Sequence, residues 1–186
     1  MSRILEIEHD HKPLYRVVRR GCTDPLDISH SKRRLGDYRW NSGEFGALYC
    51  CCSEWVARAV ALDRLRLAGL DMTDLQTPAR PQLVEISWSG RVVDVSSNEG
   101  VAAAGFPASY PEGVRKEQTR RAAAQWRATG AGGVVFRSAA LQRRGFSHWS
   151  GAHQRWSETA IFLGNGESPP TLIRRRDDSA WLGSAT

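Results

Sequence analysis

The sequence lacks any long apolar run. No stretch of its 186 residues approaches the roughly 20 apolar residues that cross a bilayer. The N-terminal segment, MSRILEIEHDHKPLYRV, mixes acids, bases and histidines, and it has neither the apolar centre nor the small-residue cleavage site of a signal peptide. We therefore expect no membrane association and a cytoplasmic location.

Spaced cysteines are also missing. The four cysteines are Cys22 and the consecutive Cys50, Cys51 and Cys52, which supply neither a CxxC metal geometry nor a disulfide framework. Small buried hydrophobes in a strand are the expected role, and a reactive thiol is the alternative. Two histidine pairs lie close in sequence, His9 with His11 and His148 with His153. Neither pair has helical i, i+4 spacing or a nearby cysteine, so we expect no metal site.

Lysine is scarce, although the chain is basic. The formal net charge is +6, and Lys12, Lys32 and Lys116 are the only lysines among 26 basic residues. Such a charge suggests an anionic partner, which could be a nucleotide, a nucleic acid or an acidic protein. The arginines are scattered and form no continuous basic tail, which disfavours nucleic-acid binding by this chain alone. Their small clusters are Arg33-Arg34, Arg120-Arg121, Arg143-Arg144 and Arg174 to Arg176.

The chain shows no internal repeat and no low-complexity linker, and its length suits one domain over residues 1–186. Alternating or apolar β-formers predict several short strands, and helical periodicity predicts two helices. We expect an α+β fold. The expected strands are 14–18, 47–51, 83–88, 91–95, 132–136 and 159–163, with 172–173 as one more; the expected helices are 55–68 and 115–127, and 96–113 is expected to be loop.

Two local signals refine this outline. Ser53 is expected to cap the first helix, which would end before Gly69 with basic residues in its last turn. Ser89-Gly90 is expected to join the strands 83–88 and 91–95 as a hairpin.

Three short motifs follow one another in order. Tyr15-Arg16 lies in the first strand; Arg39-Trp40-Asn41 with Gly43 precedes Ala47-Leu48-Tyr49; and Gly132 to Ala139 reads GGVVFRSA. This series resembles the RES domain, and the motif-bearing part spans about residues 14–163. The resemblance implies an ADP-ribosyltransferase-like core, a mixed or split β-sheet with flanking helices.

The RES resemblance also implies a function. Its members are small bacterial toxins that take NAD as substrate and cleave it between nicotinamide and ribose. The outcome is hydrolysis, phosphorolysis or transfer of ADP-ribose to a protein. Many are neutralised by a neighbouring Xre-like antitoxin. We therefore expect NAD and an antitoxin as partners, and a homodimer is compatible with the sequence.

The motif residues suit this chemistry. Arg16 and Arg39 offer planar forks for the pyrophosphate of NAD. Tyr49 can stack on the nicotinamide or ribose while its hydroxyl makes a hydrogen bond, and Ser138 can bond a ribose hydroxyl or the carboxamide. The resemblance assigns catalysis to Arg39, Tyr49 and Ser138, and NAD binding to these three with Arg16. Each could instead have an ordinary structural role.

One position departs from the family pattern. The family carries a glutamate about eleven residues after the strand tyrosine, where this chain has Val60. Glu54 and Asp63 are the nearby acids that could replace it; Asp63 lies one helical turn further on, roughly 4.5 Å along the axis. The alternative is a catalytically weakened RES fold that binds a nucleotide or a protein. A third alternative is a nucleic-acid binder that uses the arginine clusters.

Overall fold

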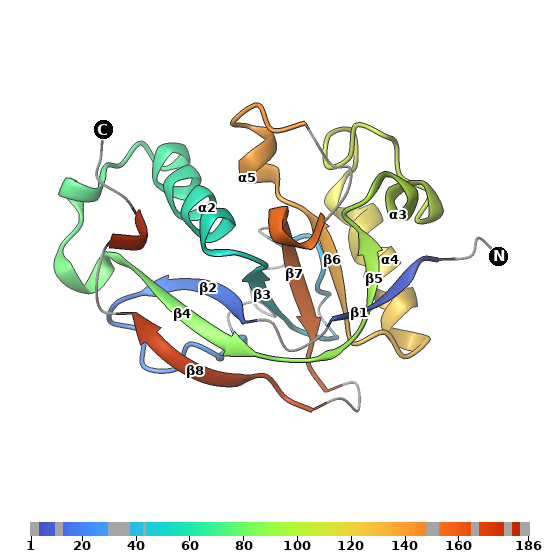
Figure 1. Ribbon diagram of the computed structural model, residues 1–186, viewed down its shortest axis with the longest axis horizontal. Helices are drawn as coiled ribbons and strands as arrows, with labels where there is room; N and C mark the ends of the chain where they lie inside the picture. Colours follow the sequence, from blue (N-terminus) through green and yellow to red (C-terminus); the bar gives the residue numbers. More distant parts are fainter. Residues whose placement is uncertain are drawn as a thin grey trace.

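The computed structural model describes residues 4–9, 13–29, 38–42, 44–147, 153–164, 168–176 and 180–182. Its centre is an eight-stranded sheet in the order β1-β5-β6-β7-β3-β2-β4-β8 (Figure 1). The strands are β1 Glu6–His9, β2 Leu14–Arg19, β3 Ala47–Cys51, β4 Pro81–Ser87, β5 Gly90–Val95, β6 Gly133–Arg137, β7 Ser157–Phe162 and β8 Thr171–Arg176. The helices are α2 Glu54–Leu67, α3 Asn98–Ala103, α4 Lys116–Ala128 and α5 Ala139–Gln142, with 3-10 turns at Met72–Asp74, Thr77–Ala79, His153–Trp156 and Ala180–Leu182.

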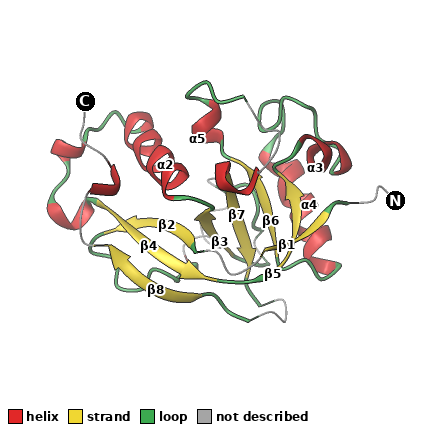
Figure 2. Ribbon diagram, in the orientation of Figure 1, coloured by secondary structure: helices red, strands yellow, loops and turns green. Residues whose placement is uncertain are grey.

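The sheet is mixed and split. β5 and β6 pair in parallel, whereas the other described pairs are antiparallel. β2 and β3 share one aligned pair, Tyr15 with Cys51, while β2 pairs with β4 along its whole length. The sheet therefore divides into β1-β5-β6-β7-β3 and β2-β4-β8. Helices and strands alternate irregularly (Figure 2), so the expected α+β class and the split, ADP-ribosyltransferase-like sheet are confirmed.

The expected hairpin at Ser89-Gly90 is wrong. β4 has β2 and β8 as its neighbours, and β5 has β1 and β6. Both edges of each strand are therefore occupied by other strands. Figure 1 shows the chain running on from β4 into β5 without folding back. The alternating pattern identified both strands correctly but contained no information about their partners.

The segment 96–113 after β5 was expected to be loop, but part of it forms helix α3. Ser97 caps this helix by accepting a hydrogen bond from the Gly100 backbone N–H at 2.9 Å. Gly100 packs so closely on β5 that an added Cβ would lie 2.3 Å from the carbonyl oxygen of Asp94. The glycine that suggested a loop is thus required for helix packing. Two other short elements, β1 and α5, were not predicted from the sequence.

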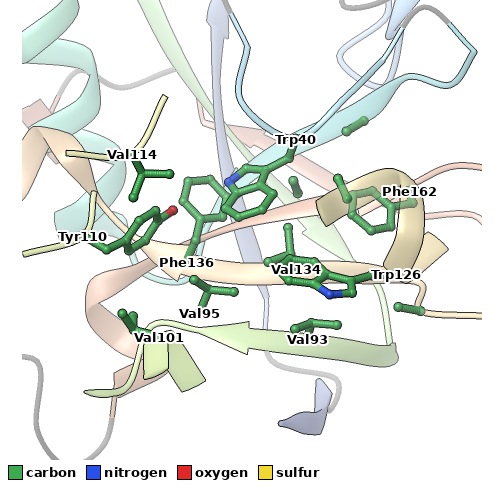
Figure 3. Close-up of a cluster of buried hydrophobic side chains, with 14 of the residues drawn as sticks. Trp40, Val93, Val95, Val101, Tyr110, Val114, Trp126, Val134, Phe136 and Phe162 are labelled. Atoms are coloured by element: carbon green, nitrogen blue, oxygen red, sulfur yellow. The ribbon is translucent and has the colours of Figure 1, made fainter. Parts of the chain in front are cut away.

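One core cluster holds the Arg39-Trp40-Asn41 motif in place. Trp40 is completely buried and stacks on Trp126 of α4 at 5.6 Å, with Phe136 of β6 at 5.5 Å on another side. Figure 3 shows Trp40 among these side chains, Tyr110 and the valines of β5 and β6. A large buried aromatic fixes the chain on both sides of it. The segment that carries Arg39 is therefore anchored although it belongs to no strand.

Where the structure describes the chain, no helix is long and apolar enough to cross a membrane.

Candidate functional site

Helix α2 is positioned by its cap. The Ser53 hydroxyl accepts a hydrogen bond from the Val56 backbone N–H at 3.3 Å and donates one to the Arg155 carbonyl at 2.6 Å. The expected cap is therefore confirmed. Gly69 follows the helix with a φ of 67°, a left-handed conformation that favours glycine. The register that results turns Val60 and Arg64, one turn apart, toward the same space.

Two adjoining cavities form one cleft between α2 and the sheet. The first measures about 590 Å³ and the second about 310 Å³. Both volumes lie in or near the range of small-molecule sites, which is roughly 300–1,000 Å³. The five residues that line both cavities, and so mark their junction, are Tyr38, Tyr49, Val60, Arg64 and Glu158.

Arg16 lines the first cavity, at the split between β2 and β3. Its side chain is buried, and its Nη1 donates to the Tyr49 carbonyl oxygen at 3.2 Å. Burial lowers the pKa of the Arg16 guanidinium from its ordinary value. Arg16 thus ties β2 to β3 where they share one aligned pair.

Tyr49 uses its hydroxyl inside the protein. The oxygen accepts a hydrogen bond from the Trp40 backbone N–H at 2.8 Å and donates one to Asn41 Oδ1 at 3.0 Å. Burial raises the pKa of Tyr49 far above its ordinary value, so the hydroxyl stays protonated. Its ring stacks on Tyr38 with centroids 5.1 Å apart. Tyr49 therefore holds the Trp40-Asn41 segment and presents a ring to the cleft.

Arg39 lines the second cavity. Its Nη1 donates to the Val114 carbonyl oxygen at 3.2 Å, and its own carbonyl oxygen accepts from Thr119 Oγ1 of α4 at 2.8 Å. The main chain of Arg39 is thus held by α4 and by the buried Trp40 that follows it. Arg16, Arg39 and Tyr49 all border the same cleft, although their roles toward NAD stay a prediction.

Ser138 lies behind the cleft wall. It is completely buried, and its Oγ accepts a hydrogen bond from the Leu141 backbone N–H at 3.5 Å, which caps α5. The same side chain lowers the pKa of the Glu158 carboxyl. Ser138 therefore faces the site through Glu158.

Glu158 is the site residue that sequence analysis missed. It lies on β7 between Cys51 of β3 and Phe136 of β6, and it lines both cavities. Burial raises the pKa of its carboxyl, while the Ser138 hydrogen bond and nearby arginines oppose this shift. The expected strand began at residue 159, two residues after the observed start at Ser157, and so left Glu158 out. The alternation in Ser157–Phe162 was the available signal, because it places Glu158 on the face opposite to Thr159.

The two acids expected as replacements do not offer a carboxylate to the junction. Asp63 borders the second cavity, but Arg143 Nε donates to its two oxygens at 3.1 and 3.2 Å, and Arg66 adds a bond at 3.3 Å. Burial alone would raise the pKa of Asp63, but these arginines lower it. Glu54 forms an ion pair with Arg176 at 3.1 Å, away from the described lining of both cavities.

Arg137 supports the cleft from inside the protein. It is 2% exposed and donates to three carbonyl oxygens, those of Ser96, Ala108 and Tyr110, at 3.0, 2.9 and 3.1 Å. Its Nη2 also donates to Asn98 Oδ1 at 2.6 Å. Burial lowers its pKa. Arg137 thus organises the segment that contains α3.

The consecutive cysteines Cys50 and Cys51 fit the expected role of small buried hydrophobes in a strand. Cys50 and Cys51 are buried, and burial raises the pKa of Cys50 to about 12 and that of Cys51 well above its ordinary value. Such thiols stay protonated and react slowly. Several residues named from the sequence lie outside the described part of the chain: Gly43, His11, Lys12, Lys32, His148 and the pair Arg33-Arg34. Among the described residues, no group of three histidines, cysteines or acids is placed to hold a metal ion.

Comparison with known proteins identifies the family. The chain is similar in structure to a chain in the crystal structure of the M. tuberculosis MbcT-MbcA toxin-antitoxin complex, with a TM-score of 0.69 and 16% identity over 92% of this chain and 85% of that one. At this identity the likeness shows a shared fold. No curated protein matches the sequence. A family model described as the RES domain matches residues 13–155, most of the chain. The chain therefore belongs to the RES domain family.

Proposed function

We propose that this protein consumes NAD by cleaving the bond between nicotinamide and ribose. The observation that carries the proposal is that Arg16, Arg39, Tyr49 and Glu158 border one cleft in a RES-family chain, with Ser138 behind its wall. A dinucleotide has two nucleoside halves joined by a pyrophosphate. Two cavities that meet at a junction lined by aromatic and charged side chains suit that shape.

The charges of the second cavity favour an anion. Arg39, Arg64 and Lys116 line it together with Arg137 and Arg143. Arg137 is bound to three backbone oxygens and to Asn98, and Arg143 is bound to Asp63. The Arg39 guanidinium makes one described bond, to the Val114 carbonyl oxygen, so Arg39 and Arg64 are the arginines that we assign to the pyrophosphate. Guanidinium groups bind phosphate oxygens through two parallel hydrogen bonds. Tyr38 and Tyr49 supply rings on which nicotinamide or its ribose can stack.

In the proposed reaction the bond from C1′ to the pyridinium nitrogen breaks, and its electron pair goes to that nitrogen. Nicotinamide leaves as a neutral molecule, and positive charge develops on the ribose. Water then forms a bond to C1′ and loses a proton, which gives ADP-ribose. Phosphate or a protein side chain would attack the same carbon in phosphorolysis or transfer. A fixed negative group near C1′ stabilises the developing cation in each case.

The biological setting follows from the family. We propose that the chain is a bacterial toxin, held inactive by a neighbouring antitoxin of the Xre-like kind that the family resemblance implies. Its similarity to a chain from a toxin-antitoxin complex supports a protein partner in general. A homodimer and a cytoplasmic location belong to the same proposal.

The direct test is nicotinamide release from NAD by the purified protein, followed by chromatography with and without phosphate. We expect turnover in the wild type and a loss of at least tenfold in kcat/KM for Arg39→Ala. Arg121→Ala is the matched control, since Arg121 lies on an exposed part of α4 outside the described cleft lining. ADP-ribose as product indicates hydrolysis, and ADP-ribose-1″-phosphate indicates phosphorolysis. Equal rates in both variants would contradict the site.

A second function is favoured by Val60, which puts an apolar side chain where the family pattern has a glutamate. In this case the cleft would bind NAD or another nucleotide without cleaving it. Folded protein that binds NAD in calorimetry but releases no nicotinamide would support the binding module over the enzyme.

A further inference from the structure

Val60 and Glu158 face the same space from opposite walls of the cleft. Val60 comes from α2 and Glu158 from β7, and each lines both cavities. Val60 is 8% exposed, so α2 presents an apolar, nearly buried side chain at this position. Among the described residues, Glu158 is the one carboxylate common to the two cavities. The acid that is absent from the helix has a counterpart across the cleft.

The other carboxylates around the cleft have local roles. Asp24 accepts a hydrogen bond from the Leu26 backbone N–H at 2.8 Å, and Asp27 accepts from the backbone N–H and hydroxyl of Ser29 at 2.7 and 2.9 Å. Both lie in the exposed loop after β2. Asp63 is bound by arginines, as described above. These carboxylates shape the walls and do not reach the junction of the cavities.

The sheet positions Glu158. Its strand has hydrogen-bonded neighbours on both sides, β3 and β6. Ser138, which caps α5, lowers the pKa of the Glu158 carboxyl and so favours its charged form. A carboxylate carried by a central strand is pre-organised for electrostatic stabilisation.

We propose that the carboxylate of Glu158 supplies from β7 the negative charge that the family pattern places on the helix at residue 60. This rests on the proposed cleavage of NAD. Glu158 lies just past the segment that the family model matches, so the assignment comes from the geometry of this chain.

The proposed step is balanced as follows. The bond from C1′ to nitrogen breaks, its electron pair leaves with nicotinamide, and ionised Glu158 faces the cationic ribose. A water molecule bonds to C1′ through its oxygen and transfers one proton to the Glu158 carboxylate. The protonated carboxyl then releases this proton to solvent, which restores the starting state. No oxidant or other co-reactant is needed.

Glu158→Gln tests the proposal, because it removes the charge and keeps the shape. We expect kcat for nicotinamide release to fall by about 100-fold or more, the size of effect seen when one transition-state contact is lost. NAD affinity, measured by calorimetry, should change by less than about threefold. Glu54→Gln is the matched control: it removes a carboxylate on the neighbouring helix, outside the described cleft lining, and should leave kcat unchanged.

A second variant tests the exchange of positions. Adding Val60→Glu to Glu158→Gln should restore kcat by at least tenfold over the single variant, since the two side chains reach the same junction. Thermal unfolding of each variant shows whether it is folded, and if the double variant does not fold, the single variant decides.

The outcomes separate the two proposals. A wild type that turns over, with Glu158→Gln as active as Glu54→Gln, overturns the role of Glu158 and leaves the NAD-consuming function intact. A folded wild type without nicotinamide release overturns both.

Discussion

Ser138 caps the first turn of α5 and also lowers the pKa of the Glu158 carboxyl on β7. A completely buried serine therefore influences the charge of a residue in the cleft. Burial raises the pKa of Glu158, and Ser138 opposes this shift. We therefore expect Ser138 to act as a positioning residue.

Replacing Ser138 by alanine should change the pH profile of NAD cleavage. Without the Ser138 hydroxyl, the pKa of Glu158 rises further, so less carboxylate is ionised at a given pH. The acidic limb of the kcat/KM profile should therefore move to higher pH, and the rate should recover on the alkaline side. Ser109→Ala, at an exposed serine, should leave the profile in place. Loss of the α5 cap alone would lower stability by about 1 kcal/mol without moving this limb.

Tyr49→Phe should destabilise the protein and slow the reaction. The substitution leaves the buried Trp40 backbone N–H and Asn41 Oδ1 without their phenolic partner. An unsatisfied buried polar group costs about 1–3 kcal/mol, so we expect the free energy of unfolding in urea to fall by about 2 kcal/mol. The rate should fall too, since Arg39 adjoins Trp40. Tyr15→Phe, on β2 outside the described cleft lining, should cost less than about 0.5 kcal/mol; an equal loss in both would contradict this role.

Arg143→Ala should weaken the attachment of α5 to α2. It removes the two-pronged contact to Asp63, whose side chain is 4% exposed. Loss of a partner from a buried pair costs about 3–5 kcal/mol, but Arg143 is 44% exposed, so we expect about 2 kcal/mol in urea unfolding. The neighbouring Arg144→Ala is the matched control and should be nearly neutral.

The same pair predicts how stability depends on pH. Arg143 and Arg66 hold the folded-state pKa of Asp63 below its ordinary value despite the opposing effect of burial. The contribution of Asp63 to the free energy of unfolding is therefore fully present when the pH is above the ordinary pKa of the group. It is lost as the pH falls through the lowered pKa of the folded state. The acid-induced loss of stability should be smaller in Arg143→Ala than in the wild type. A parallel loss in both would exclude this ion pair as the cause.

Arg64→Ala should weaken NAD binding. Arg64 lies at the junction of the cavities, one turn after Val60. A lost charge-assisted contact to phosphate is worth about 1.5–3 kcal/mol, which corresponds to roughly tenfold or more in Kd by calorimetry. Added salt should reduce the difference in Kd between the wild type and Arg64→Ala, because salt screens exposed charges. Arg58→Ala on the same helix, beside the separate cavity at Trp55, should keep the wild-type affinity.

Local sequence signals predicted much of the scaffold. The Ser53 cap, the apolar periodicity and the following Gly69 defined α2 to within one residue, and β3 was predicted with its observed bounds. Both elements depend on local propensity and capping, which a sequence displays directly. Three residues singled out by the ordered motifs, Arg16, Arg39 and Tyr49, also border one cleft.

Other features depend on contacts between distant segments. The pairing of β4 and β5 was set by competition among strands, which alternation does not encode. α3 and α5 are too short for periodicity to reveal, and each begins at a serine cap inside a segment that reads as loop. Glu158 was missed because the predicted strand began two residues late, so its orientation toward Tyr49 and Phe136 was not considered.

The bonds of Arg137 have a consequence for how the α3 segment can vary. The Arg137 guanidinium alone binds several points of this segment, and apart from Asn98 the described acceptors are main-chain oxygens. Side chains from Ser96 to Tyr110 can thus change in evolution without removing these bonds, whereas the arginine cannot, since lysine lacks the planar fork that reaches several oxygens at once. Because Arg137 directly precedes Ser138, the α3 segment and the candidate site depend on the same short stretch at the end of β6.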